Sequence, residues 1–80
     1  MLPKDVEIEQ VISVIKLNET VKNYKHLNIW TNNAEEVELS VHLSLDDMDK
    51  VKVVKDEIKE GLRNMGIDIV TLAFKKHKED

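Results

Sequence analysis

The chain has 80 residues, of which 41% are hydrophobic and 35% charged, and its formal net charge is −4. This length predicts a single domain over residues 1–80, and the acidic balance argues against nucleic-acid binding. Cysteine is absent, which excludes disulfides and cysteine nucleophiles. No apolar run approaches the roughly 20 residues that cross a bilayer, so a soluble domain is expected.

The first predicted element is a helix over residues 3–17. Pro3 suits its first turn, and Asn18 follows its end. Its apolar residues recur at the three- and four-residue spacing of one buried face: Ile8, Val11, Ile12 and Ile15.

Two strands are predicted next, over residues 24–31 and 37–45, because polar and apolar residues alternate in both. The alternation places His26 and Trp30 of the first strand on one face and points Leu27 to the other. In the second strand, His42 points away from the apolar face. Asn32 and Asn33 supply the hairpin turn, since asparagine tolerates left-handed backbone angles.

A second helix is predicted over residues 44–66, followed by a strand over residues 67–75. Ser44 or Asp46 is expected to cap this helix, and Gly66 suits the left-handed position that ends it. Met48 and Met65 belong to its apolar stripe and are expected in the core. The last residues, KKHKED, are interpreted as a frayed charged tail.

These elements predict an α+β, ferredoxin-like αββαβ fold, a three-stranded sheet with two helices on one face. We expect the last strand to pair beside the first. The other sheet face then stays uncovered, and Trp30 and Ile69 on it predict a partner surface and a homodimer.

Histidines with neighbouring carboxylates are the only site-like chemistry in this sequence. His26 and His42 become cross-strand neighbours if the hairpin register allows it, and two neutral imidazoles suit Zn²⁺ and similar ions. Plain surface histidines are the alternative. No arrangement of a serine nucleophile with its base can be argued, so an enzyme is not expected.

Three segments carry a family resemblance. KHLNIW, ending at Trp30, and LSVH, ending at His42 twelve residues later, are similar to the pattern V-x-x-H-D-L-H-V-W followed by L-S-V-H. EGLRNMGIDIVTL is similar to L-x-x-x-(F/M)-G-I-x-x-V-T-I-Q. Both patterns are typical of the cytosolic C-terminal domain of cation diffusion facilitator transporters, and the resemblance covers almost the whole chain.

This resemblance implies a metallochaperone-like module on the cytoplasmic side of a membrane. Such a module dimerises beneath the transmembrane domain of a divalent-cation antiporter and binds metal, Zn²⁺ above all, at the dimer interface. His42 stands at the position of the family's second-strand ligand, and His26 at the position of an aspartate. The pattern departs from the family where Lys25 and Asn28 replace histidines, Ala73 a glutamine or histidine, and Lys75 an acidic residue.

The resemblance therefore implies either a reduced site that uses His26, His42 and His77, or a domain that dimerises with little metal regulation. The alternative function is a free-standing ferredoxin-like module that binds a small molecule or a protein. The absence of a C-x-x-C loop argues against a copper chaperone of this architecture. If the chain is part of a transporter, the choice of transported metal is expected to be made in a membrane part outside this sequence.

Overall fold

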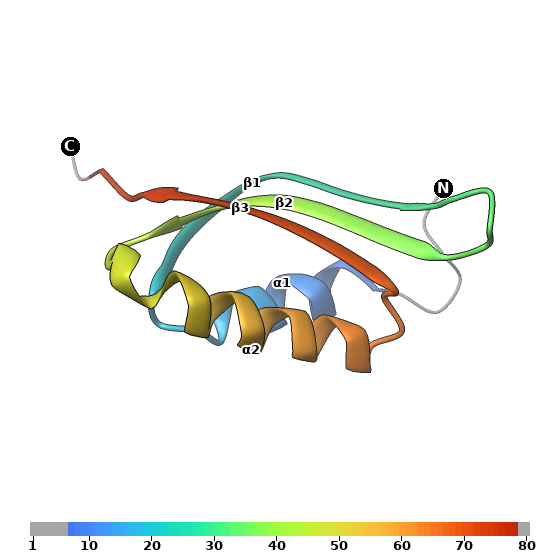
Figure 1. The fold of residues 1–80 in the computed structure, drawn as a ribbon, viewed down its shortest axis with the longest axis horizontal. Coiled ribbons are helices and arrows are strands. Elements are labelled where there is room, and N and C mark those ends of the chain that lie inside the picture. The colour runs from blue at the N-terminus through green and yellow to red at the C-terminus, as the bar shows by residue number, and fades with distance from the viewer. Residues whose placement is uncertain (1–6, 79–80) are drawn as a thin grey trace.

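The computed structural model describes residues 7–78, which form a three-stranded sheet with two helices on one of its faces (Figure 1). The predicted order of helix, strand, strand, helix and strand is confirmed, whereas the predicted helical turn around Pro3 lies outside the described residues. No helix among these residues is long and apolar enough to cross a membrane. The elements are α1 (Ile8–Lys16), β1 (Val21–Thr31), β2 (Val37–Leu45), the short 3₁₀ helix η1 (Met48–Lys50), α2 (Val51–Asn64) and β3 (Ile69–Lys76).

The strand order is β1-β2-β3, so the expectation that the last strand pairs beside the first is wrong. β1 pairs antiparallel with β2, and β3 pairs parallel with β2 on its other edge. The physical reason lies in β2, whose inward side chains Leu39, Val41, Leu43 and Leu45 are fully buried. The most apolar strand is best placed in the centre, where both of its edges are paired.

The core lies between the inner face of the sheet and the two helices. α1 contributes Val11 and Ile15, and α2 contributes Val54, Ile58 and Leu62, so each helix buries one stripe at helical spacing. Ile67, which precedes β3, and Val70 within β3 complete the core. These residues and the three leucines and one valine of β2 form one continuous cluster, against which partly buried residues of β1 pack.

The two helices approach closely at Gly61. A Cβ atom added there would lie 2.8 Å from Cγ1 of Val14, closer than real Cβ contacts. A glycine in the middle of a helix normally costs about 1 kcal/mol of helix stability relative to alanine. At this position it is required by the packing of α1 against α2.

The helix and turn ends depart in detail from the sequence-based expectations. Asp47, rather than Ser44 or Asp46, caps the helical segment, since its side chain accepts a hydrogen bond from the Asp49 N–H. Ser44 is instead buried in β2. Met48 is not in the core, because it lies in η1 ahead of α2 and is 37% exposed.

The hairpin turn also uses a different residue from the one expected. Glu35, with φ of 63°, takes the left-handed conformation that was assigned to asparagine. The Asn32 side chain instead accepts hydrogen bonds from the backbone N–H groups of Ala34 and Glu36, at 2.9 and 3.0 Å. Gly66 does adopt the predicted left-handed conformation after α2, with φ of 98°.

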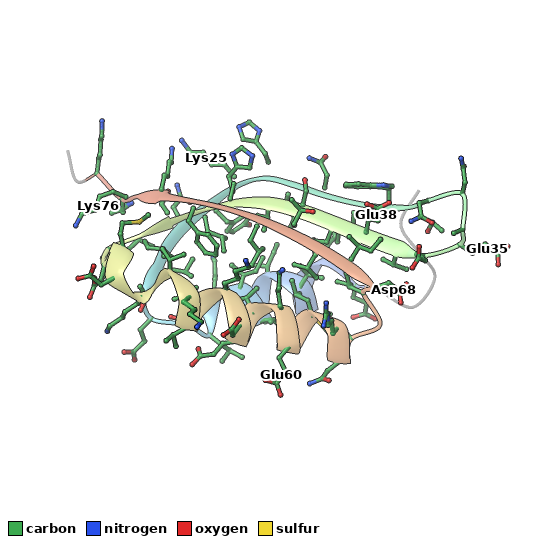
Figure 2. All side chains as sticks on the ribbon, viewed as in Figure 1. Lys25, Glu35, Glu38, Glu60, Asp68 and Lys76 are labelled. Carbon is green, nitrogen blue, oxygen red and sulfur yellow. The ribbon has the colours of Figure 1, made fainter. Side chains whose placement is uncertain are left out.

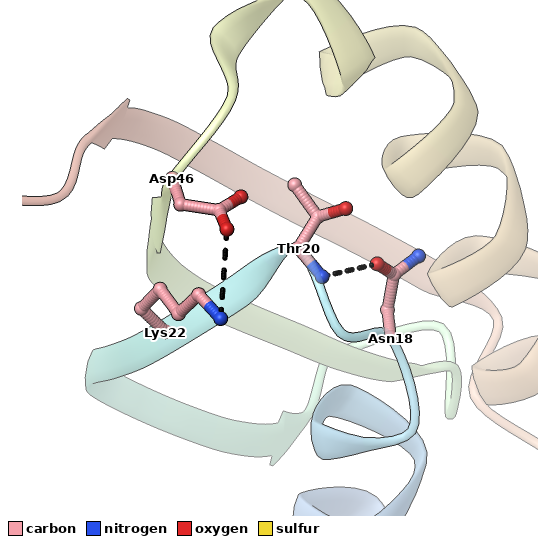
Figure 3. A network of polar contacts seen from close by, with 4 residues as sticks. All are labelled: Asn18, Thr20, Lys22 and Asp46. Atoms are coloured by element: carbon pink, nitrogen blue, oxygen red, sulfur yellow. Dashed lines mark hydrogen bonds and ion pairs between the residues drawn. The ribbon is translucent and has the colours of Figure 1, made fainter.

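A network of polar contacts holds the turn between α1 and β1 against the end of β2 (Figure 3). Asn18 accepts a hydrogen bond from the Thr20 N–H through Oδ1 and donates to Glu57 of α2 through Nδ2. Lys22 forms an ion pair with Asp46 at 3.5 Å. Both ends of that pair are about half exposed, so it positions the turn more than it stabilises the fold.

Candidate functional site

The sheet face turned away from both helices is open in the described part of the chain, as predicted (Figure 1). Its side chains form rows across the three strands. The rows follow from the strand register and comprise Trp30, Glu38 and Ile69; then Asn28, Ser40 and Thr71; then Lys25, His42 and Ala73; and finally Asn23, Ser44 and Lys75. The histidine row lies near the middle of the sheet and is the candidate site.

A β-bulge brings His26 to this row. Lys25 pairs with His42 and Asn28 with Ser40, so β1 carries one residue more than β2 between the two pairs. The extra residue is accommodated at His26, whose φ is 55°. As a result Lys25 and His26 are both exposed, while Leu27 turns back toward the core.

The bulge costs conformational free energy at His26, and a hydrogen bond from a neighbouring residue holds it in place. A residue other than glycine with positive φ costs on the order of 1 kcal/mol, although histidine is enriched in this region. The Asn28 side chain donates a hydrogen bond to the His26 carbonyl at 3.2 Å and so holds the bulge. Bulges commonly re-aim side chains next to functional sites, and here the effect is to place a second imidazole beside His42.

His26 and His42 lie side by side, with ring centroids 5.1 Å apart and planes inclined by 69°. Both side chains are exposed, so an ion can reach them from solvent. Two imidazoles bound to one tetrahedral Zn²⁺ at about 2.0–2.1 Å would have ring centroids roughly 5 Å apart. The spacing and the chemistry of this pair therefore fit two ligands of one borderline-soft divalent ion.

The pair alone does not complete a metal site. Among residues 7–78, no group of three or more His, Cys, Asp or Glu side chains is arranged to hold a metal ion. On one side His42 faces Lys25 across the β1–β2 pairing, and on the other it faces Ala73 of β3. A lysine ammonium repels a divalent cation and a methyl group cannot ligate one, so one protomer offers two ligands and an adverse charge.

His77, the third histidine proposed from the sequence, lies at the end of the sheet. Its backbone N–H donates a hydrogen bond to the Leu45 carbonyl at 2.7 Å. It borders a hollow together with Lys75, Lys76 and Lys78 and does not join His26 and His42 in a three-histidine cluster. The interpretation of the last residues as a frayed tail is therefore wrong for Lys75 to His77, since the pairing of β3 with β2 extends through them.

The predicted partner surface lies two rows from the histidines. Trp30 and Ile69 flank Glu38 on the open face, and their side chains are 40% and 36% exposed. Glu38 accepts a hydrogen bond from the Asn32 side chain at 2.9 Å, which fixes it between the two apolar groups. An exposed tryptophan and an exposed isoleucine on one sheet face are typical of contact surfaces between proteins.

Comparison with known proteins gives a family match and matches among solved structures. The family described as "Cation efflux protein, cytoplasmic domain" matches residues 3–68. Among solved structures, the metal-bound C-terminal domain of the CzcD transporter from Cuprividus metallidurans is similar, with 28% sequence identity and a TM-score of 0.80. That likeness covers 88% of this chain and 99% of the other. No sequence among curated proteins matches the chain.

Proposed function

Because the chain belongs to the family of cytoplasmic domains of cation efflux proteins, we propose that it is the dimerisation and metal-responsive domain of a divalent-cation efflux transporter. In this proposal two copies associate through their open sheet faces, and a divalent ion, Zn²⁺ first, binds to His26 and His42. The transmembrane domain of the same transporter is the second partner. The similar domain of CzcD is metal-bound, which supports a metal ligand here.

The observation that carries the metal proposal is the His26–His42 pair. The bulge in β1 costs conformational energy, and its consequence is the placement of one imidazole 5.1 Å from another on an exposed face. A histidine that contacts only solvent does not require a second imidazole beside it. When bound, the ion would supply a positive charge that draws several ligand-bearing segments together, and His26 and His42 would hold it through ring nitrogens.

Two copies provide what one copy lacks. Zn²⁺ in proteins usually takes four ligands, and one protomer brings two. A two-fold axis near the histidine row would add the same two imidazoles from the second copy, which yields four ligands and one ion per dimer. Trp30 and Ile69 lie on the same face and would add apolar contact to that interface.

The charge of the site sets the expected affinity. Each protomer brings the ammonium of Lys25 into the histidine row, and no carboxylate of the described residues joins the pair to offset it. We therefore expect dissociation constants on the order of micromolar rather than nanomolar. Binding is also expected to weaken in acidic solution, since imidazole coordinates only in its neutral form.

Calorimetric titration of the metal-stripped protein with Zn²⁺ tests the proposal. Wild type should bind about one ion per two chains, and either His42→Ala or His26→Ala should remove most of the heat. His77→Ala is the matched control, because it deletes the same side chain outside the pair, and it should bind like wild type. Identical binding by wild type and His42→Ala would refute the assigned ligands.

Sedimentation of the same samples tests dimerisation separately. The metal-free protein is expected to reach twice the monomer mass at tens of micromolar, and Zn²⁺ should shift the equilibrium further toward the dimer, since a ligand that binds only the dimer stabilises it by mass action. A monomer that persists at hundreds of micromolar, with and without metal, would contradict the proposed role.

A further inference from the structure

A second site is indicated at the end of the sheet where β2 and β3 finish. A hollow of about 490 Å³ opens there, and four lysines line it: Lys25, Lys75, Lys76 and Lys78. Its remaining lining residues are Asn23, Ser44 and His77. We propose that this basic hollow binds a phosphoryl group that carries two or more negative charges.

Three of the four lysines come from strands, Lys25 from β1 and Lys75 and Lys76 from β3, and Lys78 follows the end of β3. Lys75 and Lys76 pair in parallel register with Ser44 and Leu45, and the His77 N–H donates to the Leu45 carbonyl at 2.7 Å. Lys25 reaches the hollow from β1, next to the bulge that turns it to the open face. Segments that are far apart in the sequence thus line one hollow with basic residues, on a backbone held by sheet hydrogen bonds.

Among the described residues, the charge around the hollow is opposite to that of the whole chain. The formal net charge is −4, yet no aspartate or glutamate of residues 7–78 lines the hollow. Within residues 7–78 the structure contains one lysine–carboxylate ion pair, between Lys22 and Asp46, so the lining lysines have no carboxylate partner in that part. Figure 2 shows Lys76 at one end of the sheet, Lys25 in the same half, and Glu35, Glu38 and Asp68 in the other half.

The donors present select the class of ligand. Lysine ammonium groups repel one another when they cluster, and a dianion relieves twice as much of that repulsion as a carboxylate does. Lysine binds phosphate as a point charge and needs no fixed fork geometry. The Ser44 hydroxyl and the Asn23 amide are able to donate hydrogen bonds to phosphoryl oxygens.

This ligand chemistry has two sources for a domain at the cytoplasmic side of a membrane. One is a free oxyanion such as pyrophosphate, and the other is the phosphorylated headgroup of an anionic lipid. The inference goes beyond the proposed metal function and stands on different residues, apart from the neighbouring Lys25. It is therefore tested on metal-free protein, so that failure of either proposal leaves the other intact.

The test compares two double variants with the same change in net charge. Lys25→Gln with Lys75→Gln removes two lysines of the hollow, and Lys52→Gln with Lys55→Gln removes two exposed lysines of α2. The full 80-residue chain is titrated with pyrophosphate in low salt and followed by amide NMR shifts, and its co-sedimentation with phosphatidylcholine vesicles is measured with and without a phosphoinositide. Circular dichroism verifies that each variant is folded.

The variant with Lys25→Gln and Lys75→Gln should lose at least about fivefold in affinity for pyrophosphate or for the phosphoinositide vesicles. The variant with Lys52→Gln and Lys55→Gln should lose less than about twofold in the same affinity. Pyrophosphate binding with shifts at Asn23, Ser44 and Lys76 would identify a free oxyanion as ligand. Binding to phosphoinositide vesicles alone would identify the lipid headgroup. Absence of both, or equal losses in the two double variants, would overturn the proposal.

Discussion

The charge of Lys25 is the part of the candidate metal site whose effect is most directly predictable. Lys25 lies directly opposite His42 in the antiparallel pairing, and the bulge turns both Lys25 and His26 to the open face. Replacing Lys25 with methionine keeps the length and apolar stem of the side chain and removes its charge. We expect this change to tighten Zn²⁺ binding.

The magnitude follows from Coulomb's law. Opposed residues have Cβ atoms about 5 Å apart, so an ammonium and an ion held by the imidazoles lie roughly 7 Å apart. A single charge and a double charge at this distance in water repel by about 1.2 kcal/mol, which is roughly a sevenfold change in affinity for each Lys25 of the dimer. Physiological salt, with a Debye length of about 8 Å, reduces this to roughly twofold for each Lys25.

Calorimetric titration at two ionic strengths, about 0.02 M and about 0.15 M, measures this repulsion and its screening by salt. Lys25→Met should gain more affinity over wild type at the lower ionic strength, and Lys25→Glu should gain more than Lys25→Met because it reverses the charge and adds a carboxylate. Lys52→Met, on the helical side of the molecule, is the control and should bind like wild type. Equal affinity of wild type and Lys25→Met at both ionic strengths would refute the placement of the ion beside His42.

Three further predictions concern the fold and the interface. Gly61→Ala should lower the free energy of unfolding in urea by about 1 kcal/mol, although alanine has the better helix propensity. In a Val14→Ala background, where the 2.8 Å contact is relieved, the same change should raise the free energy of unfolding. Equal effects in both backgrounds would contradict the packing argument. The free energy of unfolding of His26→Gly should lie within about 1 kcal/mol of the wild-type value, whereas that of His26→Val should be about 1–2 kcal/mol lower, because valine is strained at positive φ. Equal free energies of unfolding for the two variants would count against a strained bulge. Trp30→Ser should raise the dissociation constant of the dimer about tenfold or more in sedimentation equilibrium. Val53→Ser, which changes an exposed apolar residue of α2, should leave that constant unchanged. Equal dissociation constants for wild type and both variants would exclude the Trp30 surface as interface.

The secondary structure elements were predictable because each has its own hydrophobic period. The stripe of α2 and the alternation of β2 predict both elements. β2 has the predicted bounds, whereas α2 begins at Val51, seven residues after the predicted start of the helix. The position of β3 was not predictable in this way. Its period shows which face is buried but not which neighbour it pairs with, and the strand pairing was decided by the complete burial of β2 between two partners.

The histidine pair was predictable only as a possibility that depended on register. Simple alternation places Lys25 and His26 on opposite faces, and the bulge makes them neighbours on the same one. A signal was present in the sequence, since two pairs of consecutive polar residues, 22–23 and 25–26, separate the half-buried residues 21, 24 and 27. A spacing of three in a strand indicates bulges, and β1 has irregularities in its register at both places.

The incompleteness of the histidine pair has a thermodynamic consequence for the proposed dimer. If the ion takes two ligands from each copy, metal binding and dimerisation are one coupled equilibrium, and each strengthens the other by the same factor. A site with four imidazoles inside one protomer would bind metal without responding to assembly. The depleted set of ligands, with Ala73 and Lys25 on either side of His42, thus makes metal affinity depend on the second copy. Because Lys25 also lines the basic hollow, an anion bound there would reduce the repulsion at the metal site and couple the two sites on this face.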